Sequence, residues 1–148
     1  MTKFTFRLES ILSIKLKLEE QAKMEFGAAK IKLNEEQDKL EGLFDKKSEY
    51  EEELKRLYSD DLDVKRINGT ARAIDIVDEQ IKLQKYAVKR AEKQVDLATQ
   101  KLNTVMQERK SMEKLKENRF AEYMREYNEE ESKQTDELIS YQYGKVEE

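Results

Sequence analysis

Histidine, cysteine, proline and tryptophan are all absent from this chain of 148 residues, and only four residues are glycine. Without cysteine there is no disulfide framework, no thiolate nucleophile and no sulfur ligand for a metal. Without histidine the sequence lacks the commonest general base and the commonest metal ligand. The lack of proline and the scarcity of glycine leave few points at which a long helix would be interrupted. We therefore expect neither a metal site nor a cofactor.

Long apolar runs are missing as well. No stretch approaches the ~18 consecutive apolar residues of a membrane span, and the N-terminus lacks the uninterrupted apolar region of a signal peptide. We therefore expect a cytoplasmic protein without direct membrane insertion. The net charge of −4 gives no reason to expect nucleic acid as a partner.

A regular apolar seam runs from Thr70 to about Lys116. Apolar residues recur there at alternating steps of three and four, which places them on one face of a helix. A narrow seam with a period near 3.5 residues is typical of a coiled coil, and it needs a second helix to cover it. The seam comprises Ile74, Val77, Ile81, Val88, Ala91, Val95, Ala98, Leu102, Val105 and Met112, interrupted by Gln84 and Arg109.

The first part of the chain carries a matching seam, which predicts a helix over residues 4–58. Leu8, Ile11, Leu18 and Ala22 begin the pattern, with Lys15 as a gap. The heptad phase then shifts, which predicts a local unwinding near residues 22–27. The seam continues through Phe26, Ala29, Leu33, Leu40, Leu43, Tyr50, Leu54 and Leu57. This helix is the natural partner for the second seam.

Residues 59–69 separate the two seams and predict a loop. Aspartate and serine compete with helix by bonding to the nearby backbone, and the pair Asn68-Gly69 favours a left-handed backbone. Thr70 is the expected N-cap of a second helix over residues 70–142. The loop aspartates lack the glycine and the distal glutamate of an EF-hand, so we expect a solvated turn and no metal.

The distribution of charge predicts that the two helices pair antiparallel. Residues 34–63 contain twelve acidic and five basic residues, whereas residues 64–93 contain eight basic and four acidic ones. Folding back at the loop sets these segments side by side, while a parallel homodimer would stack the acidic segment on its own copy. We therefore expect an all-α fold: two long helices in an antiparallel coiled-coil hairpin, forming one unit over residues 1–148.

The second helix is the longer one, and its end is acidic. From Glu126 onward there are eight acidic and two basic residues. Two interpretations stay open for this tail. It is either a partly frayed, solvated helix end or a segment that a partner orders.

No group of residues predicts catalysis. Glutamates on a two-helix hairpin are not enclosed, and acid–base chemistry needs a carboxylate in a pocket that shifts its pKa. The sequence has no glycine-rich phosphate loop and no metal-ligand spacing. We therefore expect a protein that is not an enzyme and that works by contacting other proteins, at the open end where both termini meet or along the half near the loop.

The open end resembles a known family. The pattern F-x-F-R-L-x-x-I-L over residues 4–12, followed by an amphipathic helix, resembles the start of the flagellar export protein FliJ family. The pattern Q-E-R-K-x-x-E-x-L-K over residues 107–116 is also similar to that family. Chain length, the single hairpin and the charged tail agree, so the resemblance covers essentially the whole chain.

The resemblance implies a non-enzymatic, cytoplasmic component of the flagellar type III protein export apparatus, peripheral to the inner face of the cell membrane at the flagellar base. Such proteins are similar to the central stalk of rotary ATPases. They are taken to bind the hexameric export ATPase with the open end of the hairpin and to promote its assembly, and they are linked to export chaperones. The residues implied to face the ATPase ring are Phe4, Phe6, Arg7, Leu8, Ile11, Leu12, Arg109, Lys110, Glu113 and Lys116.

The half near the loop is implied to contact the cytoplasmic domain of the export gate, a membrane protein. Leu43, Tyr50 and Val77 are the candidates for this contact, but each also sits on a seam, so helix packing is the alternative role. Arg109 has two interpretations too: it reaches a carboxylate of the ring, or its stem packs while the guanidinium reaches solvent. The alternative function for the whole chain is a generic coiled-coil scaffold or tether that acts as a homodimer.

Overall fold

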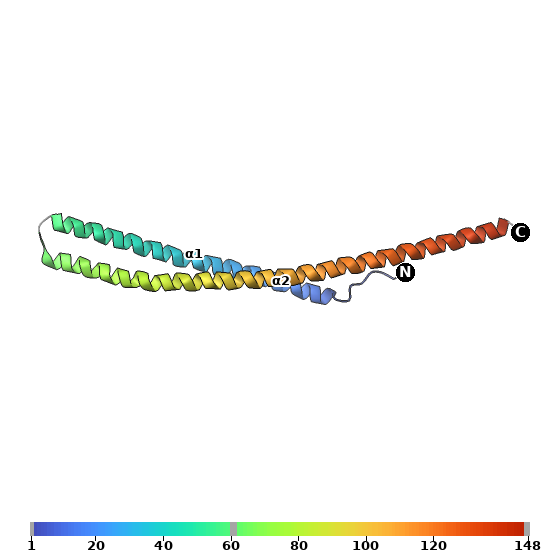
Figure 1. Ribbon diagram of the computed structural model, residues 1–148, viewed down its shortest axis with the longest axis horizontal. Helices are drawn as coiled ribbons and strands as arrows, with labels where there is room; N and C mark the ends of the chain where they lie inside the picture. Colours follow the sequence, from blue (N-terminus) through green and yellow to red (C-terminus); the bar gives the residue numbers. More distant parts are fainter. Residues whose placement is uncertain (1, 60–61, 147–148) are drawn as a thin grey trace. The chain divides into compact units, whose positions relative to one another are not determined.

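The computed structural model describes residues 2–59 and 62–146. In this part of the chain α1 spans Glu9–Ser59 and α2 spans Val64–Val146 (Figure 1), and there is no strand. The predicted all-α fold is confirmed: two long helices pack against each other, and the second helix is the longer one.

The chain divides into two compact units, each of which pairs part of α1 with part of α2. The loop unit covers Gln21–Asn103, and the terminal unit covers Met1–Glu20 and Thr104–Glu148. Within each unit, residue numbers fall on one helix as they rise on the other, which is antiparallel pairing. The ion pairs that show it are Lys47–Asp78 and Glu25–Lys101 in the loop unit, and Lys15–Glu108 and Glu9–Lys116 in the terminal unit. The interpretation of residues 1–148 as one unit stays a prediction.

The core of the loop unit is a strip of side chains between the two helices. On α2 the buried apolar residues are Val77, Ile81, Val88 and Ala91. Burying a side chain such as that of Val77, which is 2% exposed, stabilises the fold by roughly 1.5–3 kcal/mol. Most seam members of α1 in this unit are half-buried, because one partner helix covers only part of each side chain, whereas Ala22 and Glu36 are buried.

The seam of α1 keeps one phase, so the predicted unwinding near residues 22–27 is wrong. Ile11 and Leu18 were expected on the seam but are 42% and 40% exposed, and the buried Leu12 and Glu19 occupy those turns instead. Lys15, expected as a gap in the seam, lies on it and is half-buried. The buried and half-buried positions, at alternating steps of three and four, include Leu12, Lys15, Glu19, Ala22, Phe26, Ala29, Leu33, Glu36, Leu40, Leu43, Lys47, Tyr50, Leu54 and Leu57.

The second helix begins at Val64, earlier than the predicted start at residue 70, so most of the predicted loop over residues 59–69 is helix. Asp63 supplies the cap. Its Oδ1 accepts hydrogen bonds from the backbone N–H groups of Lys65 at 3.2 Å and Arg66 at 3.4 Å. These bonds satisfy amides that the first turn of a helix leaves without a partner. The predicted loop aspartates at positions 60 and 61 lie outside the described residues.

The pair Asn68-Gly69 therefore does not form a turn. Neither residue has a positive φ, and both lie inside α2. Thr70, the predicted N-cap, is buried within the helix. The cost of a glycine in a helix interior is only about 1 kcal/mol, which a capped helix of 83 residues tolerates.

The first helix begins at Glu9 and not at residue 4 as predicted. The backbone N–H of Glu9 donates to the carbonyl of Phe6 at 3.1 Å, and the residues before this turn are not helical. The side chain of Phe6 is 8% exposed. The N-terminal segment, residues 2–8, is thus held by packing in the terminal unit and does not prolong α1.

Candidate partner-binding site at the open end

The N-terminal segment packs on α2 through aromatic rings. The ring centroid of Phe4 lies 5.2 Å from that of Phe120 and 5.5 Å from that of Tyr123, and Tyr123 stacks on Tyr127 at 6.3 Å. The hydroxyl of Tyr123 donates to the backbone carbonyl of Thr2 at 2.9 Å. Ring pairs of this kind each add about 0.5–1.5 kcal/mol beyond the area that they bury. The cluster therefore fixes the segment against α2 without helical backbone bonds.

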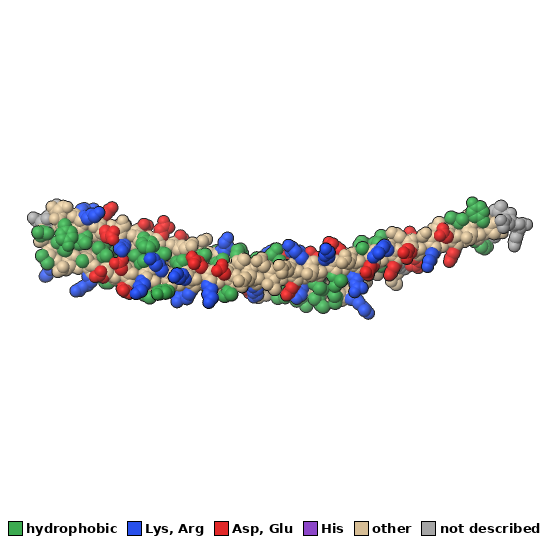
Figure 2. All heavy atoms as spheres, viewed as in Figure 1, with side chains coloured by type: hydrophobic (Ala, Val, Ile, Leu, Met, Phe, Trp, Pro, Cys, Tyr) green, Lys and Arg blue, Asp and Glu red, His purple; other side chains and the backbone are tan. Residues whose placement is uncertain are grey.

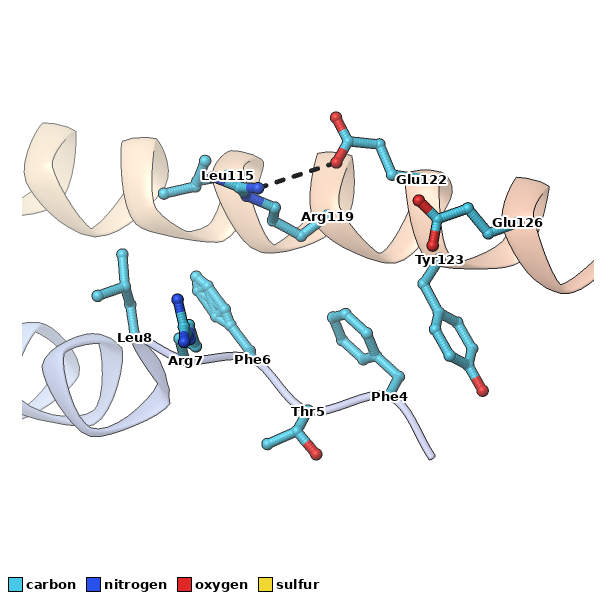
Figure 3. A pocket seen from close by; sticks show the side chains of 10 residues that line it. All are labelled: Phe4, Thr5, Phe6, Arg7, Leu8, Leu115, Arg119, Glu122, Tyr123 and Glu126. Carbon is cyan, nitrogen blue, oxygen red and sulfur yellow. Dashed lines mark ion pairs between the residues drawn. The ribbon is translucent and has the colours of Figure 1, made fainter. Parts of the chain in front are cut away.

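A hollow opens between this segment and α2 (Figure 3). Phe6 and Leu8 point across it toward α2, and Phe4 lies beside Tyr123. Its lining combines apolar and charged side chains, a mixture that suits a side chain of a partner protein. The lining residues are Phe4, Thr5, Phe6, Arg7, Leu8, Leu115, Arg119, Glu122, Tyr123 and Glu126.

Arg109 lies on the seam of α2 and binds a glutamate of α1. Its Nε donates to Oε2 of Glu19 at 2.6 Å and its Nη2 to Oε1 at 3.1 Å, while Nη1 donates to Oε2 of Glu113 at 2.9 Å. The side chain of Glu19 is 6% exposed and that of Arg109 is 19% exposed. The hydrogen bond to Glu19, and to a lesser extent the one to Glu113, raises the pKa of Arg109 above its ordinary value. The guanidinium therefore forms a bidentate ion pair with Glu19 inside the terminal unit.

A second polar layer interrupts the seam of the loop unit. Nε2 of Gln84 donates to the backbone carbonyl of Glu36 at 2.9 Å and also to its carboxylate. Two lysines of α1 pair with the same carboxylate: Nζ of Lys32 lies 2.9 Å and Nζ of Lys39 lies 3.6 Å from Oε1 of Glu36. The bonds from Lys32 and then Gln84 lower the pKa of Glu36 to about 2, because they favour its charged form. Glu36 therefore stays ionised although it is only 7% exposed.

Acidification is expected to destabilise the helix pair of the loop unit through Glu36. A carboxyl group whose pKa is depressed on folding contributes stability that is complete above its ordinary pKa of 4.5 and is lost as the pH falls toward about 2. Thermal melts followed by circular dichroism at pH 7 and pH 3 should show a larger fall in Tm for the wild-type chain than for Glu36→Gln. Glu35→Gln, at an exposed neighbouring position, is the matched control and should behave as wild type. Equal falls for wild type and Glu36→Gln would contradict the prediction.

The residues implied to face an ATPase ring all lie in the terminal unit, but their exposure differs. Arg7, Ile11 and Lys110 are exposed and free to reach a partner. Phe6 and Leu12 are buried, so they hold the unit together. The half-buried members are Phe4, Leu8, Arg109, Glu113 and Lys116.

The residues implied to contact the export gate lie in the loop unit. Leu43 and Tyr50 are half-buried, and Val77 is enclosed in the core. Sequence reasoning gave no weight to Leu83, which is 67% exposed, one heptad beyond the exposed Ile76 on α2. The sequence signal for an exposed apolar strip was the spacing of seven residues between Ile76 and Leu83, neither of which belongs to the seam.

Sequence reasoning also missed the two buried glutamates, Glu19 and Glu36. The signal for Glu36 was a gap in the seam of α1, because position 36 lies three residues after Leu33 and four before Leu40. Glu19 gave no such signal, because the neighbouring Leu18 is apolar and was therefore assigned to the seam in its place. Both glutamates meet the polar interruptions of the α2 seam, Arg109 and Gln84.

Within the described residues, none of the helices has a stretch apolar enough and long enough to cross a membrane. The same part of the chain contains no cluster of three or more side chains suited to holding a metal ion.

A family model described as Flagellar FliJ protein matches residues 4–148. The chain belongs to the flagellar FliJ family. The resemblance inferred from residues 4–12 and 107–116 is thereby confirmed. Membership of the FliJ family, whose members are non-catalytic, makes the chain a component of the flagellar export apparatus. Neither the comparison with curated proteins nor that with solved structures gives a significant match.

Proposed function

We propose that this FliJ-family chain binds the hexameric flagellar export ATPase through its terminal unit and promotes assembly of the hexamer. In this role the terminal unit acts as the stalk subunit does in a rotary ATPase. The observation that carries the proposal is the N-terminal segment, which presents the exposed Arg7 beside a hollow lined by Phe4 and Tyr123.

The chemistry of this surface fits a protein partner. Aromatic and arginine side chains carry much of the binding energy in protein interfaces, particularly where they surround a desolvated pocket. Besides Arg7 of the N-terminal segment, Lys110 of α2 is an exposed cation of the terminal unit. A partner with carboxylates and an apolar side chain would therefore complement the terminal unit.

The loop unit is proposed to contact the cytoplasmic domain of the export gate membrane protein, which would couple the ATPase to the gate. Leu43 and Tyr50 would reach that partner, since part of each side chain is accessible. Val77 would act from within the core, by keeping the two helices in place. The proposal places the chain in the cytoplasm at the flagellar base, on the inner face of the cell membrane, and it includes escort of export chaperones.

The test measures ATP turnover and hexamer formation by the same organism's flagellar export ATPase, with and without this protein. The wild-type chain should stimulate both. Arg7→Glu combined with Lys110→Glu should weaken its binding by about tenfold or more and remove most of the stimulation, because both side chains are exposed cations of the terminal unit.

Arg72→Glu is the matched control, since it reverses an exposed charge in the loop unit. It should stimulate the ATPase as the wild type does. Full stimulation by the Arg7→Glu, Lys110→Glu variant would refute the proposed contact. No stimulation by the wild-type chain, together with a stable dimer by light scattering, would favour the alternative of a homodimeric scaffold or tether.

A further inference from the structure

The C-terminal part of α2 continues past the start of α1 in the terminal unit. Glu9, the first residue of α1, pairs with Lys116 at 2.8 Å, and the N-terminal segment reaches Tyr123 through Thr2. Beyond this point α2 remains helical, and every described side chain from Asn128 to Gly144 is exposed. We call residues 128–144 the extension; at ~1.5 Å per residue it is about 25 Å long.

The seam of α2 continues into the extension. Tyr127, Gln134, Leu138 and Tyr141 follow Tyr123 at steps of four, seven, four and three, which keeps them on one helix face. Three of these side chains, with Glu137, line a shallow hollow: Gln134, Leu138 and Tyr141. Leu138 and Tyr141 are each 63% exposed. An interface that α1 covers earlier in the terminal unit is thus exposed here.

The sides of this seam are acidic. From Glu126 to Gly144, with Glu126 included, the sequence has six acidic residues and one basic residue. Glu130 lies three residues after Tyr127 and four before Gln134, so it falls on the seam face and interrupts the apolar pattern. Glu131 and Glu137 lie at its two edges, and Glu137 lines the hollow with the seam members. The bond between the Glu131 carboxylate and the phenol of Tyr127 raises the pKa of that phenol, which agrees with this placement. Figure 2 shows carboxylates along this part of α2, with apolar side chains near its end.

We propose that the extension is a docking face for a basic amphipathic helix of another protein, which takes the place that α1 leaves. The apolar side chains lie on one face of α2 at helical spacing, as those of the α1–α2 interface do, so a docked helix would pack along α2 where α1 no longer covers it. Residues beside a coiled-coil seam select the partner by charge, and carboxylates there select lysine and arginine. A second copy of this chain fits less well, because two extensions would bring like charges together. The proposal uses none of the residues assigned above to the ATPase contact.

The test uses the full chain and a fluorescent synthetic peptide of about three heptads, with leucine at seam positions and lysine beside the seam. The matched peptide carries glutamate in place of those lysines. The basic peptide should bind with a Kd in the range of about 1–10 µM, and the acidic peptide should not bind. Raising the salt concentration should weaken binding, because the flanking charges are exposed.

Two variants of the extension locate the contact. Leu138→Ser removes an exposed apolar anchor, and Glu130→Lys with Glu137→Lys reverses one charge on the seam face and one at its edge; each should weaken binding by about tenfold. Leu83→Ser, at a side chain of similar exposure in the loop unit, should bind as wild type. All of these side chains are exposed, so circular dichroism should show unchanged helix content.

Three results would overturn the proposal. The first is equal binding of the acidic and basic peptides. The second is binding that survives both Leu138→Ser and the charge reversal, which would place the peptide elsewhere. The third is a wild-type dimer in light scattering that Leu138→Ser abolishes, which would identify a second copy as the occupant.

Discussion

Arg109→Leu is expected to lower the Tm of the protein by roughly 5 °C or more. The seam pattern alone predicts the opposite, since leucine packs better than arginine at a seam position. The structure reverses that expectation because the guanidinium makes two hydrogen bonds to the carboxylate of Glu19, whose side chain is 6% exposed. Leucine would leave this carboxylate largely buried against an apolar side chain, and removing one partner of such an ion pair is strongly destabilising.

The double variant Glu19→Leu, Arg109→Leu should recover the loss and match or exceed the wild-type Tm. Replacing both members of a buried ion pair with apolar side chains is often neutral or stabilising. The wild type, the single variants Glu19→Leu and Arg109→Leu, and the double variant form a double-mutant cycle, which isolates the coupling energy between the two residues. Lys114→Leu, at an exposed position of the same helix, is the control and should change Tm little. If Arg109→Leu alone had a Tm at or above that of the wild type, the ion pair would not stabilise the fold.

The same double variant separates the two roles considered for Arg109. Because it keeps a stable terminal unit without the guanidinium, a loss of ATPase stimulation cannot be attributed to unfolding. Stimulation equal to wild type would assign Arg109 to helix pairing alone. Loss of stimulation in the stable double variant would assign it a contact with the ATPase as well.

Val77→Asp should destabilise the loop unit by about 3–4 kcal/mol, measured as the free energy of unfolding in urea. The valine is 2% exposed, so the substitution removes its burial and places a polar carboxyl group between the helices. Its neighbour Ile76 is 54% exposed and offers a matched control. Ile76→Asp introduces the same side chain one residue away and should cost less than about 0.5 kcal/mol.

This pair of variants also bears on the export gate. If Val77 acts from within the core, Val77→Asp weakens gate binding only as far as it unfolds the loop unit. Similar losses of stability for Val77→Asp and Ile76→Asp would show that the two helices do not enclose Val77, and a direct contact with the gate would then be the better interpretation of this residue.

Much of the fold follows from local pattern. Seam residues such as Val77, Ile81 and Val88 recur at helical spacing, so the face that is buried can be read along a single helix. The antiparallel pairing follows from the contrast between an acidic and a basic segment, which is a property of whole stretches and does not depend on any one contact. The residues near Phe4 likewise led to a candidate site at the open end, and that assignment stays a prediction.

The parts that could not be predicted depend on contacts between distant residues or on competition between local signals. Glu19 is buried because Arg109 lies opposite it, and nothing near Glu19 in the sequence announces that partner. At the second helix start, the signals of Asn68-Gly69 and Asp63 conflict; the aspartate cap prevails because its carboxylate bonds first-turn amides. The N-terminal segment leaves the helical path because the ring of Phe4 packs on α2, again a distant contact.

The early start of α2 has a consequence for how the chain folds. Because Ser59 ends one helix and Val64 begins the next, contacts near these two helix ends close only a short stretch of chain, and the entropy lost on closure grows with the length of that stretch. The pair Lys47–Asp78 therefore forms at a lower entropic cost than Glu9–Lys116 does in an otherwise unfolded chain. Folding should begin in the loop unit and reach the N-terminal segment last, so the surface proposed to bring Phe4 and Arg7 to a partner should also be the first to open.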